Sequence, residues 1–152
     1  MSWDRTRPLV RVRHKFAAPP ERVFDAWLDP NSIGKWMFGP ALRNEKVLSI
    51  QMDPRPGGSF SFKVRRQGQD VDHIGTYQKI ERPRRLTFTW RVAGESDGDS
   101  VVTVDIGPKD NGSELILTHD MDPNWADFAK RTEEAWTKML NVLDQVLSKE
   151  IG

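Results

Sequence analysis

The chain has 152 residues, no cysteine, and nearly equal numbers of basic and acidic residues, 23 and 22. This length fits one domain, and the lack of cysteine excludes disulfides, thiolate metal sites and cysteine nucleophiles. The net charge of +1 gives no bulk attraction to nucleic acid.

The first expected elements are a strand and two short helices. In residues 9–16, "LVRVRHKF", every second side chain is apolar or histidine, which is typical of a strand with one dry face. Prolines 19 and 20 suit the start of a helix, and its apolar positions at helical spacing stop at Pro30. A second short helix around Trp36 should end before Gly39 and Pro40.

Six further strands are expected in series. They are "KVLSIQM" (with Leu48, Ile50 and Met52 on one face), "GGSFSFKVRR", "DVDHIGTYQKI", "LTFTWRV", "VVTVDI" and "ELILTHDM". The intervening segments are rich in Gly, Pro, Asp or Asn and read as turns, among them "GESDGDS" and "GPKDNGS" with its Asn-Gly step. Strands joined by short turns form an antiparallel meander, and one face of this sheet is apolar along nearly every strand.

The last element is a long amphipathic helix over residues 127–149. Apolar side chains recur at steps of three and four residues from Phe128 to Leu147, and charged residues take the opposite side. The charged set is Lys130, Glu133, Lys138 and Asp144. This helix is the one long apolar stripe able to cover the sheet. We therefore expect an α+β fold in a single domain, 1–152, with an ordered core at about 9–149.

This order of elements resembles the helix-grip fold of the START and birch-pollen-allergen superfamily. Within it, the chain is similar to the family named for the activator of the heat-shock-protein-ninety ATPase. The resemblance runs from Val10 to Leu147 and is carried by "FAAPPERVFDAWLDPNSIGKWM", "DPRPGGSFSFKV", "GTYQKIERPRRLTFTW" and "EEAWTKMLNVLDQVL". It implies an antiparallel sheet of about seven strands curved around the C-terminal helix. It also implies a hollow between sheet and helix, which many relatives use for apolar or aromatic small molecules.

One position departs from the family pattern. Members usually have glycine before the tryptophan of the last helix, where this chain has Ala135. The added methyl group places bulk where the helix approaches the sheet, and therefore bears on the size of the hollow.

Large apolar side chains on the inferred inner faces are the candidates for lining that hollow. They are Phe60, Phe62, Tyr77, Phe88, Trp90, Trp136 and Met139. Two interpretations stay open at this point, plain core packing and the wall of a binding pocket. We expect Leu86 to pack near its turn, and the rings at 88 and 90 to run toward the hollow.

The three histidines, His14, His73 and His119, also fall on the apolar side of their strands. The first and last strands should be antiparallel neighbours, which places His14 and His119 at different heights, and His73 lies several strands away. Because no acidic residue clearly joins them on the inner face, we expect no metal site. They are polar contacts for a ligand or satisfied core histidines.

The function expected from these features is binding of an apolar or aromatic small molecule, without a cofactor. Two alternatives remain: a chaperone-associated interaction domain with a role in the stress response, and a cyclase- or hydrolase-type enzyme using the same cavity. Basic stretches such as "ERPRR" read as solvated faces, so no nucleic acid is expected. No apolar run approaches the ~20 residues of a membrane span. Because the start shows no signal-peptide pattern, we expect a cytoplasmic protein. We expect it to be a monomer or a homodimer.

Overall fold

The computed structural model describes residues 8–39, 41–94, 100–121 and 123–151. Within them, seven strands form one antiparallel sheet in the order β1-β7-β6-β5-β4-β3-β2. The strands are β1 (Leu9–Phe16), β2 (Glu45–Met52), β3 (Ser59–Arg66), β4 (Gln69–Glu81), β5 (Arg85–Val92), β6 (Ser100–Lys109) and β7 (Gly112–Asp120). Five residues of the expected loop "GESDGDS", 95–99, lie outside the described part of the chain.

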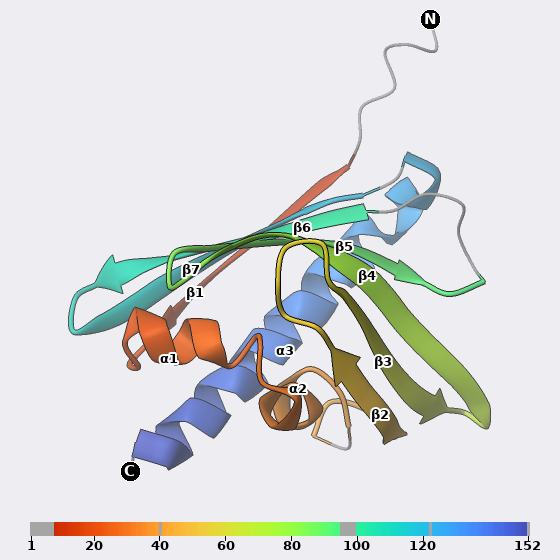
Figure 1. Ribbon diagram of the computed structural model, residues 1–152, viewed down its shortest axis with the longest axis horizontal. Helices are drawn as coiled ribbons and strands as arrows, with labels where there is room; N and C mark the ends of the chain where they lie inside the picture. Colours follow the sequence, from red (N-terminus) through yellow and green to blue (C-terminus); the bar gives the residue numbers. More distant parts are fainter. Residues whose placement is uncertain (1–7, 40, 95–99, 122, 152) are drawn as a thin grey trace, which may run out of the picture.

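The helices lie on one side of this curved sheet (Figure 1). They are α1 (Pro20–Asp25), α2 (Pro30–Trp36), a 3-10 helix η2 (Pro123–Phe128) and α3 (Ala129–Ile151). The long helix α3 runs across the concave face, and α1 and α2 lie beside it near one end. The predicted helix-grip architecture is confirmed.

The apolar alternation of the strands accounts for this arrangement. On β7, for example, Leu115, Leu117 and His119 are buried and the residues between them are half-buried. The same parity holds on β3 for Phe60, Phe62 and Val64. With a dry face along most strands, the sheet must be covered, and the apolar stripe of α3 covers it through buried residues such as Leu140 and Leu143.

An aromatic cluster fills one end of the space between the layers. The ring of Trp27 lies 4.7 Å from that of Trp36 and 5.9 Å from that of Trp136, measured between centroids. The Trp36 indole N–H donates to the carbonyl of Ala26 over 3.0 Å, which ties the end of α2 to the end of α1. This end of the interior is therefore solidly packed.

The structure adds to or corrects several local predictions. The first helical run ends before Pro30, as expected, and Pro30 is also the first residue of α2, whose N-cap Asp29 accepts a hydrogen bond from the amide of Asn31 over 3.0 Å. The expected Asn-Gly turn is displaced by one residue, because Lys109 pairs with Gly112 and the loop is Asp110 and Asn111. Asp110 takes the positive φ of 54° that this tight turn requires.

Another wrong prediction concerns β2. The pairing of β2 with β3 shifts between Val47, opposite Val64, and Ser49, opposite Lys63. Leu48 is therefore the extra residue of a bulge. Val47, rather than Leu48, joins Ile50 and Met52 in packing against the core.

The expected start of the last helix also changes. Residues 123–128 form the 3-10 helix, and Phe128, expected on the apolar stripe, keeps 39% of its surface exposed. At the other side of the stripe, Asp144, expected on the solvated side, is half-buried and contacts β1.

Candidate functional site

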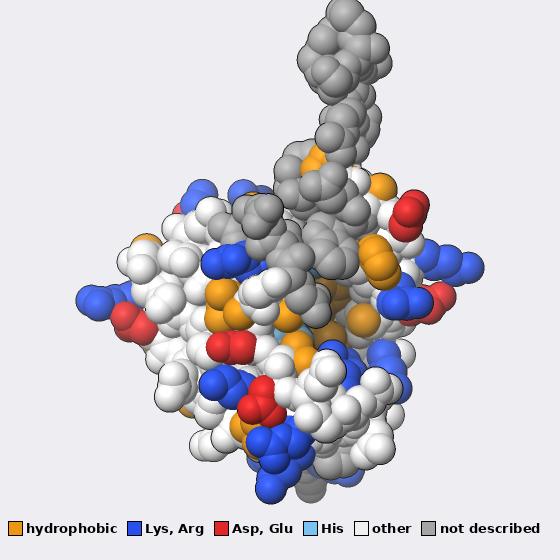
Figure 2. Space-filling model, turned by 90° about the vertical axis from the view of Figure 1, so that its right-hand side faces the viewer, with side chains coloured by type: hydrophobic (Ala, Val, Ile, Leu, Met, Phe, Trp, Pro, Cys, Tyr) orange, Lys and Arg blue, Asp and Glu red, His pale blue; other side chains and the backbone are white. Residues whose placement is uncertain are grey.

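A cavity of about 460 Å³ lies between α3 and the sheet, beside the packed aromatic end, with Trp136 on its lining. This volume lies within the range of sites for small organic molecules. Its walls come from α3, from strands β3 to β7, and from the segment between α2 and β2. Figure 2 looks onto one face of the molecule, where orange apolar and pale-blue histidine side chains lie in a hollow with blue Lys and Arg side chains beside it.

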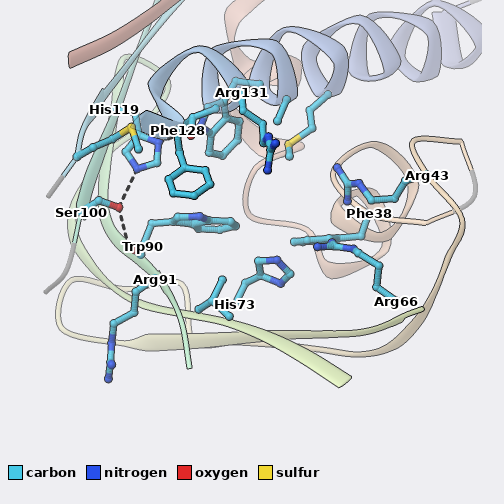
Figure 3. Close-up of a pocket in the computed structure, with 16 residues that line it drawn as sticks. Phe38, Arg43, Arg66, His73, Trp90, Arg91, Ser100, His119, Phe128 and Arg131 are labelled. Carbon is cyan, nitrogen blue, oxygen red and sulfur yellow. Dashed lines mark hydrogen bonds between the residues drawn. The ribbon is translucent and has the colours of Figure 1, made fainter. Parts of the chain in front are cut away.

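One wall of the cavity is held by a chain of hydrogen bonds through His119. The Trp136 indole N–H of α3 lies 3.1 Å from His119 Nδ1 on β7, and His119 Nε2 lies 2.7 Å from Ser100 Oγ on β6. The Ser100 hydroxyl donates to the carbonyl of Trp90 on β5 over 2.6 Å. Figure 3 shows this last step and the imidazole beside the serine.

The donors in this chain determine the state of His119. Because an indole N–H can only donate, Nδ1 must accept, and the single ring proton is on Nε2. Ser100 Oγ accepts a hydrogen bond from this N–H, and its own hydroxyl donates one to the carbonyl of Trp90, which can only accept. Burial lowers the pKa of His119 to about 4, against the opposing charge of Asp120. The imidazole is therefore neutral at pH 7 with both nitrogens occupied.

His73 lies across the cavity with a different arrangement. Its Nδ1 is 3.1 Å from the carbonyl oxygen of Phe62, so Nδ1 carries the proton and donates. Burial, aided by the Arg66 charge, lowers its pKa to about 4, and the neutral ring keeps a lone pair on Nε2. Within the described part of the chain no group donates to Nε2. The one side-chain polar atom there that is both buried and without a hydrogen-bond partner is Trp27 Nε1. His73 Nε2 is therefore not fully buried, and because His73 lines the cavity, a guest can reach this atom from there.

The buried carboxylate of Glu45 supports one end of the site. Its Oε1 lies 2.8 Å from Arg66 Nε and 2.7 Å from Arg66 Nη2; its Oε2 accepts from Arg43 Nη1 over 2.9 Å and from the Gly39 amide over 2.8 Å. Burial disfavours the charged form, but the Gly39 and Arg66 hydrogen bonds and the two arginine charges outweigh it, so the pKa of Glu45 lies below its ordinary value. The carboxylate holds both guanidinium groups at the edge of the cavity.

Five of the ten residues expected to line the hollow do line this cavity. They are His73, Trp90, His119, Trp136 and Met139. Phe60, Phe62, Tyr77 and Phe88 are not on its wall, although all four are buried. Phe60 stacks on Phe62 at 4.6 Å and meets Tyr77 at 5.3 Å and Phe88 at 5.7 Å, so these rings pack against one another and fill the layer beside the cavity.

His14, the fifth residue off the wall, has a carboxylate partner that the sequence analysis did not anticipate. Its Nε2 lies 3.0 Å from Asp144 Oδ2 of α3, which joins β1 to the helix away from the cavity. The expectation that no acidic residue meets an inner-face histidine was wrong. The histidines themselves stay apart, since Val10 lies opposite His119 and His14 lies opposite Leu115. Among the described residues, no group of three or more His, Asp or Glu is gathered as a metal site would need.

Several wall residues were missed by the sequence analysis. They are Phe38, Arg43, Arg66, Arg91, Val92, Ser100, Met121, Phe128, Arg131 and Thr132, whereas Ala135, expected to bear on the size of the hollow, also lines the cavity. Two carried a signal: Arg66 has the inward parity of Phe62 and Val64 on β3, and Arg131 lies one helical turn before Ala135. Basic side chains were assigned to solvent as a class, which concealed both.

Comparison with known proteins places the chain in a family. The family model described as "Activator of Hsp90 ATPase homolog 1-like protein" matches residues 17–148. The comparison with curated proteins gives no match.

None of the described helices combines the length and the low polarity that a membrane crossing requires.

Solved structures share the fold over nearly the whole chain. Protein CV1439 from Chromobacterium violaceum is similar at 26% identity and a TM-score of 0.76, covering 91% of this chain and 95% of its own. A protein from Rhodobacter sphaeroides is 25% identical with a TM-score of 0.78 and covers 93% of both chains. CalU16 from Micromonospora echinospora is 26% identical with a TM-score of 0.67, covering 95% of this chain and 87% of its own.

Proposed function

The chain belongs to the family of activator of Hsp90 ATPase homolog 1-like proteins, and on that premise we propose that it binds an apolar or aromatic small molecule between the sheet and α3. The observation that carries the proposal is the cavity of about 460 Å³, whose lining includes four aromatic rings, Phe38, Trp90, Phe128 and Trp136. A closed core would leave no such space at this position, because protein interiors pack at near-crystalline density.

The walls supply the driving force for binding. Trp90 and Trp136 lie 5.7 Å apart between ring centroids and Met139 also lines the cavity, so an apolar guest meets indole rings and a thioether side chain. Burying about 300 Å² of apolar ligand surface is worth about 7 kcal/mol. Ordering costs of several kcal/mol reduce this, which leaves dissociation constants in about the micromolar range.

The geometry favours binding over acid–base catalysis. His119 uses both ring nitrogens in the chain from Trp136 to Ser100, and taking a proton on Nδ1 would break the indole bond. His73 presents a free lone pair, but with a pKa of about 4 it is a weak base near neutral pH. Its Nε2 serves better as an acceptor for a hydroxyl or N–H of the guest.

A neutral fluorescent probe tests the proposal. N-phenyl-1-naphthylamine, which is dark in water and bright in apolar surroundings, is titrated into the protein and should give saturable emission with a dissociation constant of about 1–50 μM. The variant Ala135→Phe places a ring into the cavity from α3 and should reduce this affinity at least about tenfold. Glu134→Phe adds the same ring at the exposed neighbouring position and is the matched control.

Thermal unfolding of both variants verifies that they are folded. Binding that fails to saturate in the unmodified protein contradicts the proposal. Equal probe affinity in Ala135→Phe and Glu134→Phe contradicts it as well, because it would place the probe outside this cavity.

A further inference from the structure

Arginine is the one charged residue type on the described cavity wall. Arg43, Arg66, Arg91 and Arg131 line it, and no Asp or Glu is among the described lining residues. Residues 95–99, which include Glu95, Asp97 and Asp99, are outside the described part. In Figure 3 the side chains of Arg43, Arg66 and Arg131 are directed toward the space beside Phe38 and His73, whereas Arg91 extends away. Three cations therefore converge at one end of an apolar site.

Two of these cations share a single carboxylate. Glu45 has a fully buried side chain, whereas Arg43 and Arg66 keep 26% and 32% of their side chains exposed. The carboxylate oxygens are occupied by four donor contacts, but the two guanidinium groups have ten N–H donors between them. One positive charge and several N–H groups are left over at this end of the cavity.

The third cation, Arg131, comes from α3 without a carboxylate partner among the described residues. Its Cζ lies 5.6 Å from the centroid of the Phe128 ring, a cation–π distance that holds the guanidinium over an apolar surface. A neutral guest that covers this end would remove water from a cation and give nothing in return, which is costly. An anionic group would pair with it through charge-assisted hydrogen bonds.

We propose that the guest is an amphipathic organic acid: an apolar or aromatic body with one carboxylate or sulfonate group. The body lies against Trp90, Trp136 and Met139, and the acid group lies between Arg131 and the Arg43–Arg66 pair. This inference rests on the proposed function, because it concerns the guest of the same cavity.

A matched pair of probes tests it. 1-Anilinonaphthalene-8-sulfonate has the ring system of N-phenyl-1-naphthylamine with one added sulfonate, so their affinities differ through the charge. At about 150 mM salt we expect the sulfonate to bind about tenfold more tightly than the neutral probe. Dodecanoate should likewise displace either probe at about a tenfold lower concentration than dodecanol.

Variants locate the charge that is responsible. Arg131→Gln should weaken sulfonate binding about five- to tenfold and neutral-probe binding less than about twofold, and Arg131→Lys should restore most of the loss. Arg11→Gln, on the exposed outer face of β1, is the matched control and should change neither affinity. Arg131 is exposed at the surface of α3, so its replacement should leave the fold intact.

The outcomes separate the two proposals. If neither probe binds, the proposed function fails and this inference fails with it. If the neutral probe binds but the sulfonate is no tighter, or Arg131→Gln weakens both probes equally, the acid-group assignment is overturned and binding of an apolar guest stands.

Discussion

The two buried histidines of the cavity wall should make the stability of this protein depend on pH. His73 and His119 have pKa values of about 4 in the folded chain, against 6.5 for a solvated histidine. Between these values the unfolded chain binds protons that the folded chain does not, so the free energy of unfolding falls as the pH falls. The loss begins below about pH 6.5 and continues until the folded histidines titrate near pH 4.

The size of the effect follows from the two pKa values. At pH 5 an unfolded histidine is almost fully protonated and a folded one only about a tenth protonated, which gives a slope of about 1 kcal/mol per pH unit for each. Integrated from pH 7 to pH 5, each histidine removes about 2 kcal/mol, and the two together about 4 kcal/mol. That is a large share of the 5–15 kcal/mol that typically stabilises a domain.

Urea unfolding followed by tryptophan fluorescence at pH 7 and pH 5 measures this loss. Asparagine is the informative replacement, because its amide can accept from Trp136 at position 119 and donate to the Phe62 carbonyl at position 73. His119→Asn and His73→Asn should each reduce the difference in unfolding free energy between pH 7 and pH 5 by about 2 kcal/mol, and the double variant should reduce it by about 4 kcal/mol. An unchanged difference in both single variants would refute the reasoning.

Three further predictions concern stability. Glu45→Gln leaves Arg43 and Arg66 without their shared carboxylate and should cost about 3 kcal/mol in urea unfolding; a loss below about 1 kcal/mol would show that the pair is not held by charge. Gly75→Ala would place its Cβ 2.0 Å from the Thr89 carbonyl oxygen and should lower the free energy of unfolding by about 2 kcal/mol. Gly107→Ala, whose Cβ would have no atom of another segment within 4 Å, should leave the stability almost unchanged. Equal effects of the two variants would contradict the clash. A double-mutant cycle on His14→Ala and Asp144→Ala should give a coupling of about 0.5 kcal/mol, since the carboxylate is 38% exposed, and strict additivity would dismiss the contact.

The strand parities, the long helix and the family were predictable from the sequence, because each rests on a repeated local pattern. Leu115, Leu117 and His119 show their buried side through simple alternation. A bulge inserts one residue into such a pattern without altering composition, so the inward position at Val47 rather than Leu48 was not visible.

Which inward residues face a cavity was not predictable. Phe88 and Trp90 share parity on one strand, yet the first packs against Phe60 and the second lines the cavity. The difference depends on where the bent sheet separates from α3, a property of many strands together. The pairing of His14 with Asp144 likewise joins residues 130 positions apart, and no local pattern records it.

The order of the sheet leaves β1 and β2 as its two outermost strands, and each has a feature that opposes association through its free main chain. On β1, Arg11, Arg13 and Lys15 project outward in a row, so an added copy in register would bring like charges together. On β2, the extra residue at Leu48 interrupts the regular spacing of amide and carbonyl groups that a new strand would need. Fibril-like growth and edge-to-edge dimers are therefore disfavoured at both margins, and any self-association is directed to the faces of the molecule.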